Sequence, residues 1–282
     1  MEHFYIRKFI MLKHITYFLL LFQLAFIGMV NAQTADELYN TGIEKLKLED
    51  YKGAVIDFTN AIKMNPKHAK AYYNRGVVKN ILKDYKGAIQ DYTNAIAINP
   101  RYENAYYNRG FIKSELKSYK CAIEDFDKVI QLNPQYAYAY NNRGSVKKDL
   151  KDYKGAIADY DKAIEINPHD ETPYFNRGIV KYEGKDYKGA IYDFTTTLSF
   201  DPQFEDAYII QGLCRMKLKD YTGAIKDFTK AIELIPRDET AYYNRGKAEL
   251  LDGDKETACA DLNKARELGA FAASEEIKKS CK

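Results

Sequence analysis

Asparagine recurs at intervals of 34 residues through most of the chain. A carboxamide carries both a hydrogen-bond donor and an acceptor, so it can pair with a peptide group whatever side chain lies beside it. A regular series of such groups is compatible with binding and equally with bonds that join one repeat to the next. The series comprises Asn40, Asn74, Asn108, Asn142, Asn176 and Asn244, with Ile210 at the one place where asparagine is replaced.

The sequence contains no residue combination suited to catalysis or metal binding. The four histidines, His3, His14, His68 and His169, have no ligand or general base spaced around them. Glycine-rich phosphate loops, the G-x-S-x-G motif and paired-cysteine metal motifs are also missing from the sequence. We therefore expect a protein that is not an enzyme and that needs neither a cofactor nor a metal.

The asparagines belong to a repeated unit whose length is set by prolines 34 residues apart, from Pro66 to Pro236. Within each unit, apolar residues recur three and four apart on both sides of a short break, which predicts two amphipathic helices. Aspartate usually follows the break as a helix N-cap, and Asn-Pro ends the second helix. Such units bury their apolar faces only by stacking. The seven repeats span residues 35–68, 69–102, 103–136, 137–170, 171–204, 205–238 and 239–272.

The repeats also share a glycine at position 8 and an alanine at position 20, and most have an aromatic residue at position 24, as in Gly144, Ala156 and Tyr160. With the proline, this pattern resembles the tetratricopeptide (TPR) repeat, although tyrosine replaces the usual tryptophan at position 4. The resemblance, closest to exported bacterial TPR proteins, covers residues 35–272. It implies an all-α fold, a right-handed TPR superhelix (solenoid) of seven helix-turn-helix repeats plus a C-terminal capping helix.

The resemblance also implies a concave groove lined by the first helix of each repeat, with the asparagines at position 6 facing it. A similar asparagine ladder in O-linked N-acetylglucosamine transferase holds the backbone of an extended peptide. Aromatic residues beside the ladder could grip side chains; they are Tyr73, Tyr107, Tyr138, Phe175, Tyr182 and Tyr243. The alternative is that the asparagines bond the neighbouring helix and the tyrosines fill gaps between repeats, and the sequence favours neither reading.

A second series pairs arginine at position 7 of most repeats with aspartate at position 23 of all of them, as in Arg75 and Asp91. Near-equal copies in successive repeats are typical of a packing device. We expect ion pairs that fix the register of the helices, within a repeat or between neighbours.

These features predict a non-catalytic protein-protein interaction scaffold that binds an extended peptide or partner segment of unknown identity. Two alternatives remain: a carbohydrate-binding or cell-wall-binding module, because tyrosines and amides also suit sugars, and a structural protein that assembles into a homo-oligomer. Nucleic acid is not an expected partner. Residues 33–282 carry 40 Lys and Arg against 39 Asp and Glu, so the protein lacks a basic excess.

The first 32 residues form a different kind of sequence. Three basic residues, the last being Lys13, precede an apolar run from about Ile15 to Val30, and Val30-Asn31-Ala32 fits a cleavage site before Gln33. This pattern predicts a secretory signal peptide, hence an exported, periplasmic or secreted protein with no stable membrane span after cleavage. Without cleavage the segment would be an N-terminal membrane anchor. Both Met1 and Met11 are compatible with a translation start.

The last residues depart from the repeat pattern. Residues 271–282, which overlap the end of repeat seven, continue as a Glu-rich and Lys-rich helix that we expect to cap the array. Cys259 and Cys281 lie ten residues before and twelve after Gly269, which are facing places in an antiparallel helix pair. In an oxidising compartment they are expected to form a disulfide, worth about 3 kcal/mol by loop closure. The alternative is two unrelated thiols.

Overall fold

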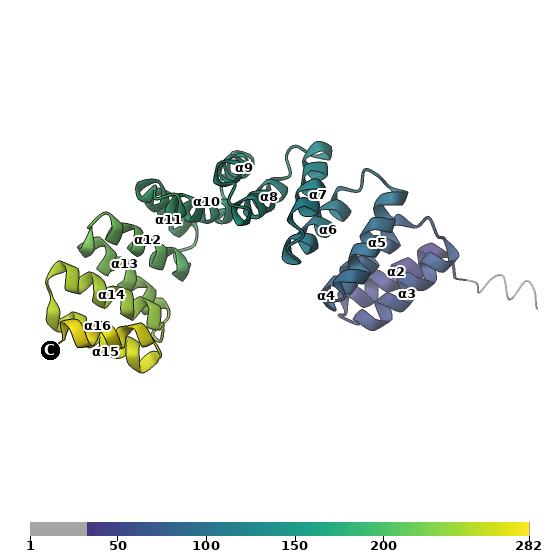
Figure 1. The fold of residues 1–282 in the computed structure, drawn as a ribbon. Coiled ribbons are helices and arrows are strands. Elements are labelled where there is room, and N and C mark those ends of the chain that lie inside the picture. The colour runs from purple at the N-terminus through teal and green to yellow at the C-terminus, as the bar shows by residue number, and fades with distance from the viewer. Residues whose placement is uncertain (1–32, 282) are drawn as a thin grey trace, which may run out of the picture. The chain divides into compact units, whose positions relative to one another are not determined.

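The structure is a computed structural model that describes residues 33–281, so the expected signal peptide lies outside the described residues. The described chain is helical throughout and contains no strand, which confirms the expected all-α class (Figure 1). The described residues divide into two compact units: unit 1 ends at Ala105, and unit 2 begins at Tyr106. The helices are α2 (Ala35–Lys47), α3 (Tyr51–Met64), α4 (Ala69–Ile81), α5 (Tyr85–Ile98), α6 (Glu103–Glu115), α7 (Tyr119–Leu132), α8 (Ala137–Asp149), α9 (Tyr153–Ile166), α10 (Glu171–Glu183), α11 (Tyr187–Phe200), α12 (Glu205–Lys217), α13 (Tyr221–Leu234), α14 (Glu239–Asp252), α15 (Lys255–Leu268) and α16 (Phe271–Ser280).

Each of the seven expected repeats contains one pair of these helices, and local chemistry sets their ends. In the fourth repeat, the Asp152 carboxylate caps α9 by accepting a hydrogen bond from the Gly155 N–H (3.0 Å). Lys151, between the two helices, adopts a left-handed conformation with φ of 63°. Asn167 leaves the helical conformation directly before Pro168, as expected for a residue that precedes proline.

Small residues let the two helices of a repeat pack closely. Ala156 and the Tyr160 ring are fully buried between them. A Cβ atom added to Gly144 on α8 would lie 2.8 Å from Cε1 of Tyr160, which is closer than a side chain tolerates. The glycine at position 8 is therefore required by the aromatic residue at position 24.

The expected ion pairs of position 7 with position 23 join the two helices of one repeat, and the same arginine also bonds the preceding repeat through another residue. Arg75 binds both carboxylate oxygens of Asp91 through Nε (2.9 Å) and Nη2 (2.7 Å). Its Nη1 donates to Thr59 Oγ1 in the preceding repeat (3.0 Å), and its guanidinium lies 5.5 Å from the centre of the Tyr72 ring. Lys79 also contacts Asp91 at 2.8 Å, so this buried carboxylate is neutralised by two cations.

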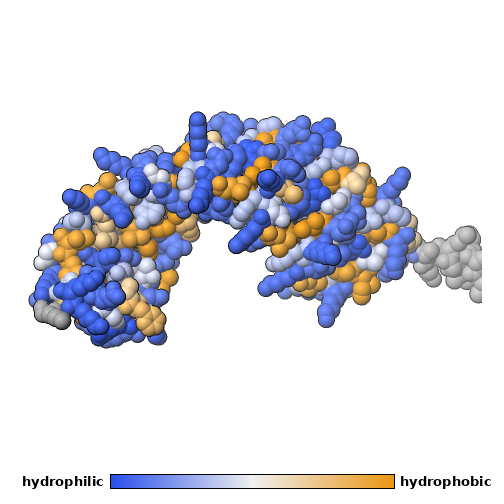
Figure 2. Space-filling view, in the orientation of Figure 1, coloured by the Kyte–Doolittle hydropathy of each residue, from blue (hydrophilic) through white to orange (hydrophobic). Residues whose placement is uncertain are grey.

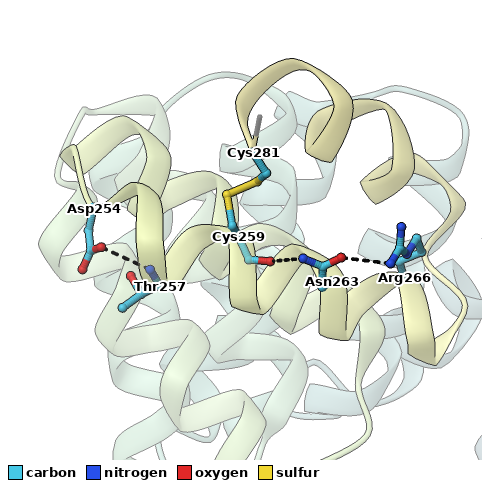
Figure 3. Close-up of a disulfide and its surroundings, with 6 residues drawn as sticks. All are labelled: Asp254, Thr257, Cys259, Asn263, Arg266 and Cys281. Atoms are coloured by element: carbon cyan, nitrogen blue, oxygen red, sulfur yellow. Dashed lines mark hydrogen bonds between the residues drawn. A yellow bond between two sulfur atoms is a disulfide. The ribbon is translucent and has the colours of Figure 1, made fainter.

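Helix α16 covers the end of the last repeat. Ala273 is buried with Leu262 and Ala265 of α15, while Ile277 packs at the edge of the same cluster. The structure joins Cys259 to Cys281 by a disulfide, with 5.7 Å between their Cα atoms (Figure 3). Cys121 and Cys214 remain free thiols.

Candidate functional site

The first helices of the repeats lie side by side within unit 2. Helix α10 contacts both α8 and α12, and α12 also contacts α14. We call the surface formed by α6, α8, α10, α12 and α14 the first-helix face. Hydrophilic and hydrophobic side chains are mixed over the visible side of this unit (Figure 2).

In residues 33–281, no helix is long and apolar enough to cross a membrane.

The asparagines of position 6 occupy equivalent places on these helices and on α2 and α4 of unit 1. Asn40 is exposed, and the others are half-buried. Asn74, Asn142 and Asn176 each bond the preceding repeat. Nδ2 of Asn74 donates to the Tyr39 hydroxyl (3.0 Å), and Nδ2 of Asn142 donates to the Tyr107 hydroxyl (2.8 Å). Nδ2 of Asn176 donates to Oδ1 of Asn141 (3.0 Å). Each of these bonds links position 6 to position 5 of the repeat before it.

The junction between repeats five and six replaces this polar pair with an apolar one. Position 5 is Phe175, which has no hydroxyl, and position 6 of the next repeat is Ile210, which has no carboxamide. Both side chains pack against the cluster that contains Phe194. The loss of asparagine does not follow the loss of the hydroxyl at every junction: repeat six has Ile209 at position 5, yet repeat seven keeps Asn244, whose Nδ2 donates to the Thr240 carbonyl of its own helix instead.

The bonds made by Nδ2 leave several carboxamide oxygens available. Nδ2 of Asn74 also donates to the Lys70 carbonyl (3.1 Å), and Nδ2 of Asn244 donates to the Thr240 carbonyl (2.9 Å). Within the described residues, Oδ1 of Asn74, Asn176 and Asn244 accepts no hydrogen bond. These asparagines thus combine a structural donor with a free acceptor.

The aromatic residues of position 5 pack mainly against other rings. Tyr107 lies 6.0 Å from Phe126 and 5.2 Å from Tyr136, measured between ring centres. Phe175 lies 4.6 Å from Phe204. In unit 1, Tyr73 lies between the Tyr92 and Tyr102 rings, and in the last repeat Lys247 covers the Tyr243 ring at 5.2 Å.

The two tyrosines at other positions differ in exposure. Tyr182 packs beside Tyr187 at 5.8 Å and is half-buried. Tyr138 is 57% exposed, and its ring lies edge-to-face with Tyr136 at 6.4 Å between ring centres. Of the six aromatic residues selected from the sequence, Tyr138 therefore offers the most open ring to a ligand.

A pocket opens on the first-helix face between α6 and α8. We call it the α6–α8 pocket, and its lining consists of Phe111, Ser114, Glu115, Asn142, Ser145, Val146 and Asp149. Asn142 is the only residue of the lining that the sequence analysis had selected. The others lie at positions 9, 10, 12 and 13 of the third and fourth repeats. The lining contains two carboxylates and no basic residue.

Tyrosines of the preceding repeats bond the carboxylates of position 13. Burial raises the pKa of the Tyr119 hydroxyl, and the nearby Asp149 carboxylate adds to the rise through its charge and a hydrogen bond. A hydrogen bond to Glu183 raises the pKa of Tyr153 in the same way in the next repeat. Because the pKa of both hydroxyls is raised, these tyrosines stay neutral at physiological pH.

In residues 33–281, no group of three or more His, Cys, Asp or Glu residues could hold a metal ion. The buried carboxylates of position 23 are neutralised by cations of their own repeats, as Asp125 is by Arg109 and Lys113. The first-helix face therefore presents hydrogen-bonding groups, charge and the α6–α8 pocket, which are the elements of a binding site.

Sequence comparisons identify the repeat. The family described as Tetratricopeptide repeat matches residues 69–102, 103–136 and 137–170, and the family described as TPR repeat matches residues 212–253. These matches together cover just over half of the chain. The chain belongs to the tetratricopeptide repeat family. A search of curated proteins gives no match.

Solved TPR structures resemble the chain over most of its length. A TPR protein from Parabacteroides merdae is 22% identical, with a TM-score of 0.65 over 89% of this chain and 100% of that one. The C-terminal part of a TPR protein from Cytophaga hutchinsonii is 18% identical, with a TM-score of 0.71 over 84% and 98%. YrrB, described as a TPR protein with an unusual peptide-binding site, is 23% identical, with a TM-score of 0.60 over 67% and 97%. At these identities the likeness shows the TPR fold alone.

TPR repeats generally mediate contacts between proteins, but the site must be read from this chain's own residues. Sequence reasoning located the asparagines of the TPR first helices and missed the α6–α8 pocket. The available signal was the acidic residue at position 13 in three successive repeats: Glu115, Asp149 and Glu183. Repeats one, two, six and seven have lysine or an aliphatic residue there.

Proposed function

We propose that this TPR protein is a non-catalytic interaction protein that binds an extended peptide segment of a partner on the first-helix face. The α6–α8 pocket beside Asn142 carries the proposal, because it offers a recess for one side chain. Free carboxamide oxygens support it further along the face. Oδ1 of Asn176, one repeat away, can accept a hydrogen bond from a peptide N–H.

Carbohydrate binding receives less support. Sugar-binding sites need open aromatic faces, and the position 5 rings are packed against other rings, as Tyr107 is against Phe126 and Tyr136. Tyr138, which lies at position 2, is the selected ring that stays open, with 57% of its surface exposed. Self-assembly would require a surface that buries apolar side chains between copies. Analytical ultracentrifugation over a wide concentration range separates this alternative from peptide binding.

The test of peptide binding blocks the pocket without disturbing the packing of the repeats. In residues 33–281, Ser114 Oγ donates to the Phe111 carbonyl of its own helix (2.7 Å) and to no other residue, so Ser114→Tyr would fill the pocket at small structural cost. Ser199 on α11 makes the same bond, to the Thr196 carbonyl (2.7 Å), outside the pocket. Ser199→Tyr is therefore the matched control.

The full-length protein is incubated with a library of immobilised random dodecapeptides, and bound peptides are identified by sequencing. We expect the wild type and Ser199→Tyr to retain the same peptides, and Ser114→Tyr to lose at least tenfold in signal. Equal retention by both variants would refute the α6–α8 pocket as the binding site. Retention of no peptide by any protein, with glycans bound instead, would favour the carbohydrate alternative.

We also propose that the protein is exported after removal of residues 1–32. The disulfide between Cys259 and Cys281 supports this proposal, because such bonds persist in oxidising compartments. N-terminal sequencing of the protein from the native host tests it. A chain that begins at Gln33 is expected, and a cytosolic protein that retains residues 1–32 would refute export.

A further inference from the structure

The charge of the α6–α8 pocket narrows the class of side chain that it accepts. Glu115 and Asp149 line it from neighbouring repeats, and no lysine or arginine does. Within the described residues Glu115 forms no ion pair, and Asp149 has only Lys148 at 3.5 Å. This contrasts with the carboxylates of position 23, such as Asp159, which is bonded by both Arg143 and Lys147. Two carboxylates in one recess, with this single long ion pair to Lys148 as their neutralisation, favour a positively charged ligand group.

The rest of the lining suits the apolar stem of a long basic side chain. Phe111 is 43% exposed at the pocket, so its ring is open to contact. The methylene groups of lysine or arginine pack on such a surface while the charged end stays near polar groups. An aromatic ring also attracts a cation directly when the charge lies over its face. Val146 adds a second apolar surface on the α8 side.

The acidic character continues along the face in one direction. Position 13 is Glu183 on α10, one repeat beyond Asp149, and it becomes Lys217 on α12. The negative stretch therefore runs over three repeats and ends at a basic residue. A peptide that places its cation in the α6–α8 pocket would thus have a preferred register on the face.

We propose that the α6–α8 pocket binds a lysine or arginine side chain of the partner peptide, with Glu115 and Asp149 as its counter-charges and Phe111 as the surface for its stem. This inference rests on the proposed peptide-binding function and assigns the class of peptide. Because the two carboxylates come from adjacent repeats, one basic side chain would bridge them.

The experiment uses the full-length protein and a positional-scanning peptide library, in which one position is fixed as each amino acid in turn and the others are random. Wild-type protein is expected to enrich lysine and arginine at one position. The affinity for a selected peptide, measured by fluorescence anisotropy, should weaken about fivefold in the Glu115→Gln/Asp149→Asn variant. A peptide with norleucine in place of the basic residue should bind both proteins equally.

The control variant carries Glu124→Gln and Asp252→Asn, two exposed carboxylates outside the pocket lining. It changes the net charge by the same amount, so it is expected to bind the basic peptide like the wild type. Enrichment of apolar or acidic residues, or equal losses in both variants, would overturn the basic-side-chain inference and leave peptide binding intact. Failure to enrich any peptide would refute the inference together with the proposed function.

Discussion

Glu249 is a buried carboxyl group at a place where five other repeats have lysine. It is 8% exposed, and it faces Asp261, which is exposed to the same extent. Arg245 lies between them but bonds Asp261 more closely, and Oε2 of Glu249 has no hydrogen-bond partner in the described part of the chain. Burial, with the charge of Asp261, raises the pKa of Glu249 to about 7. The folded state therefore binds this proton more tightly than the unfolded state does.

Because the pKa is raised on folding, the stability linked to Glu249 is complete below its unfolded value and is lost as the pH rises through about 7. We expect Glu249→Lys, which restores the residue found in other repeats, to remove that loss. The variant should exceed the wild type by about 2 kcal/mol in unfolding free energy at pH 8, and by less at pH 5. Urea denaturation followed by circular dichroism at both pH values measures the difference.

Glu256→Lys is the control, because it makes the same change of charge at an exposed position on the next helix. The pKa of Asp227 is also raised to about 7 by burial, so some pH dependence will persist in every variant. The test therefore uses the difference in unfolding free energy between each variant and the wild type at the same pH. A stability gap between Glu249→Lys and wild type that is the same at pH 5 and pH 8 would contradict the assigned pKa.

Among the described helices, the capping helix α16 is the one that a disulfide holds in place. Helix α16 has only ten residues, a length at which isolated helices are marginal in water. Few buried side chains hold it, chiefly Ala273. The bond from Cys259 to Cys281 closes a loop of 22 residues and fixes the end of α16 on α15 (Figure 3). Nearby, Asn263 bonds the Cys259 carbonyl (2.7 Å) and reinforces α15 itself.

Replacing both cysteines by serine should lower the free energy of unfolding by about 3 kcal/mol, because the unfolded chain regains the freedom of the open loop. Hydrogen exchange should rise first in α16, since α15 keeps its contacts with α14. Cys121→Ser, at an exposed free thiol, should change neither quantity. Unchanged exchange in α16 after loss of the disulfide would show that packing alone holds the cap.

The sequence predicted the helices well because their signals are local. Asp152 and Pro168 bound a helix wherever the chain lies in space. The left-handed conformation of Lys151 could not be foreseen, because lysine rarely adopts it and only Gly253 in the last repeat signals it. The hydrogen bond between Asn142 and Tyr107 could not be predicted from the sequence either. It joins residues 35 apart on separate helices, so it depends on how two repeats stack.

At the scale of the whole molecule, a stacked array transmits a disturbance mainly to adjacent repeats. Repeats four and five, which contain α8 to α11, have neighbouring repeats on both sides within unit 2. Arg143 in repeat four and Arg177 in repeat five each bond one aspartate of their own repeat and one of the preceding repeat. Helix α16 contacts α15 at the other end of the unit. We therefore expect amide exchange in unit 2 to be slowest in α8 to α11 and fastest in α16.

Gly144→Ala tests how far a disturbance travels, because its Cβ atom would lie 2.8 Å from Cε1 of Tyr160. Overpacking of this kind should cost about 1 to 3 kcal/mol and speed exchange in α8 to α11, with little effect on α15 and α16. Gly184→Ala is the control: the position has φ of −76°, and the nearest atom to an added Cβ is 3.3 Å away. Exchange measured by mass spectrometry distinguishes the two outcomes. Faster exchange throughout unit 2 in Gly144→Ala would mean that these repeats unfold as one cooperative body, because only then does local strain lower the protection of helices that it does not touch.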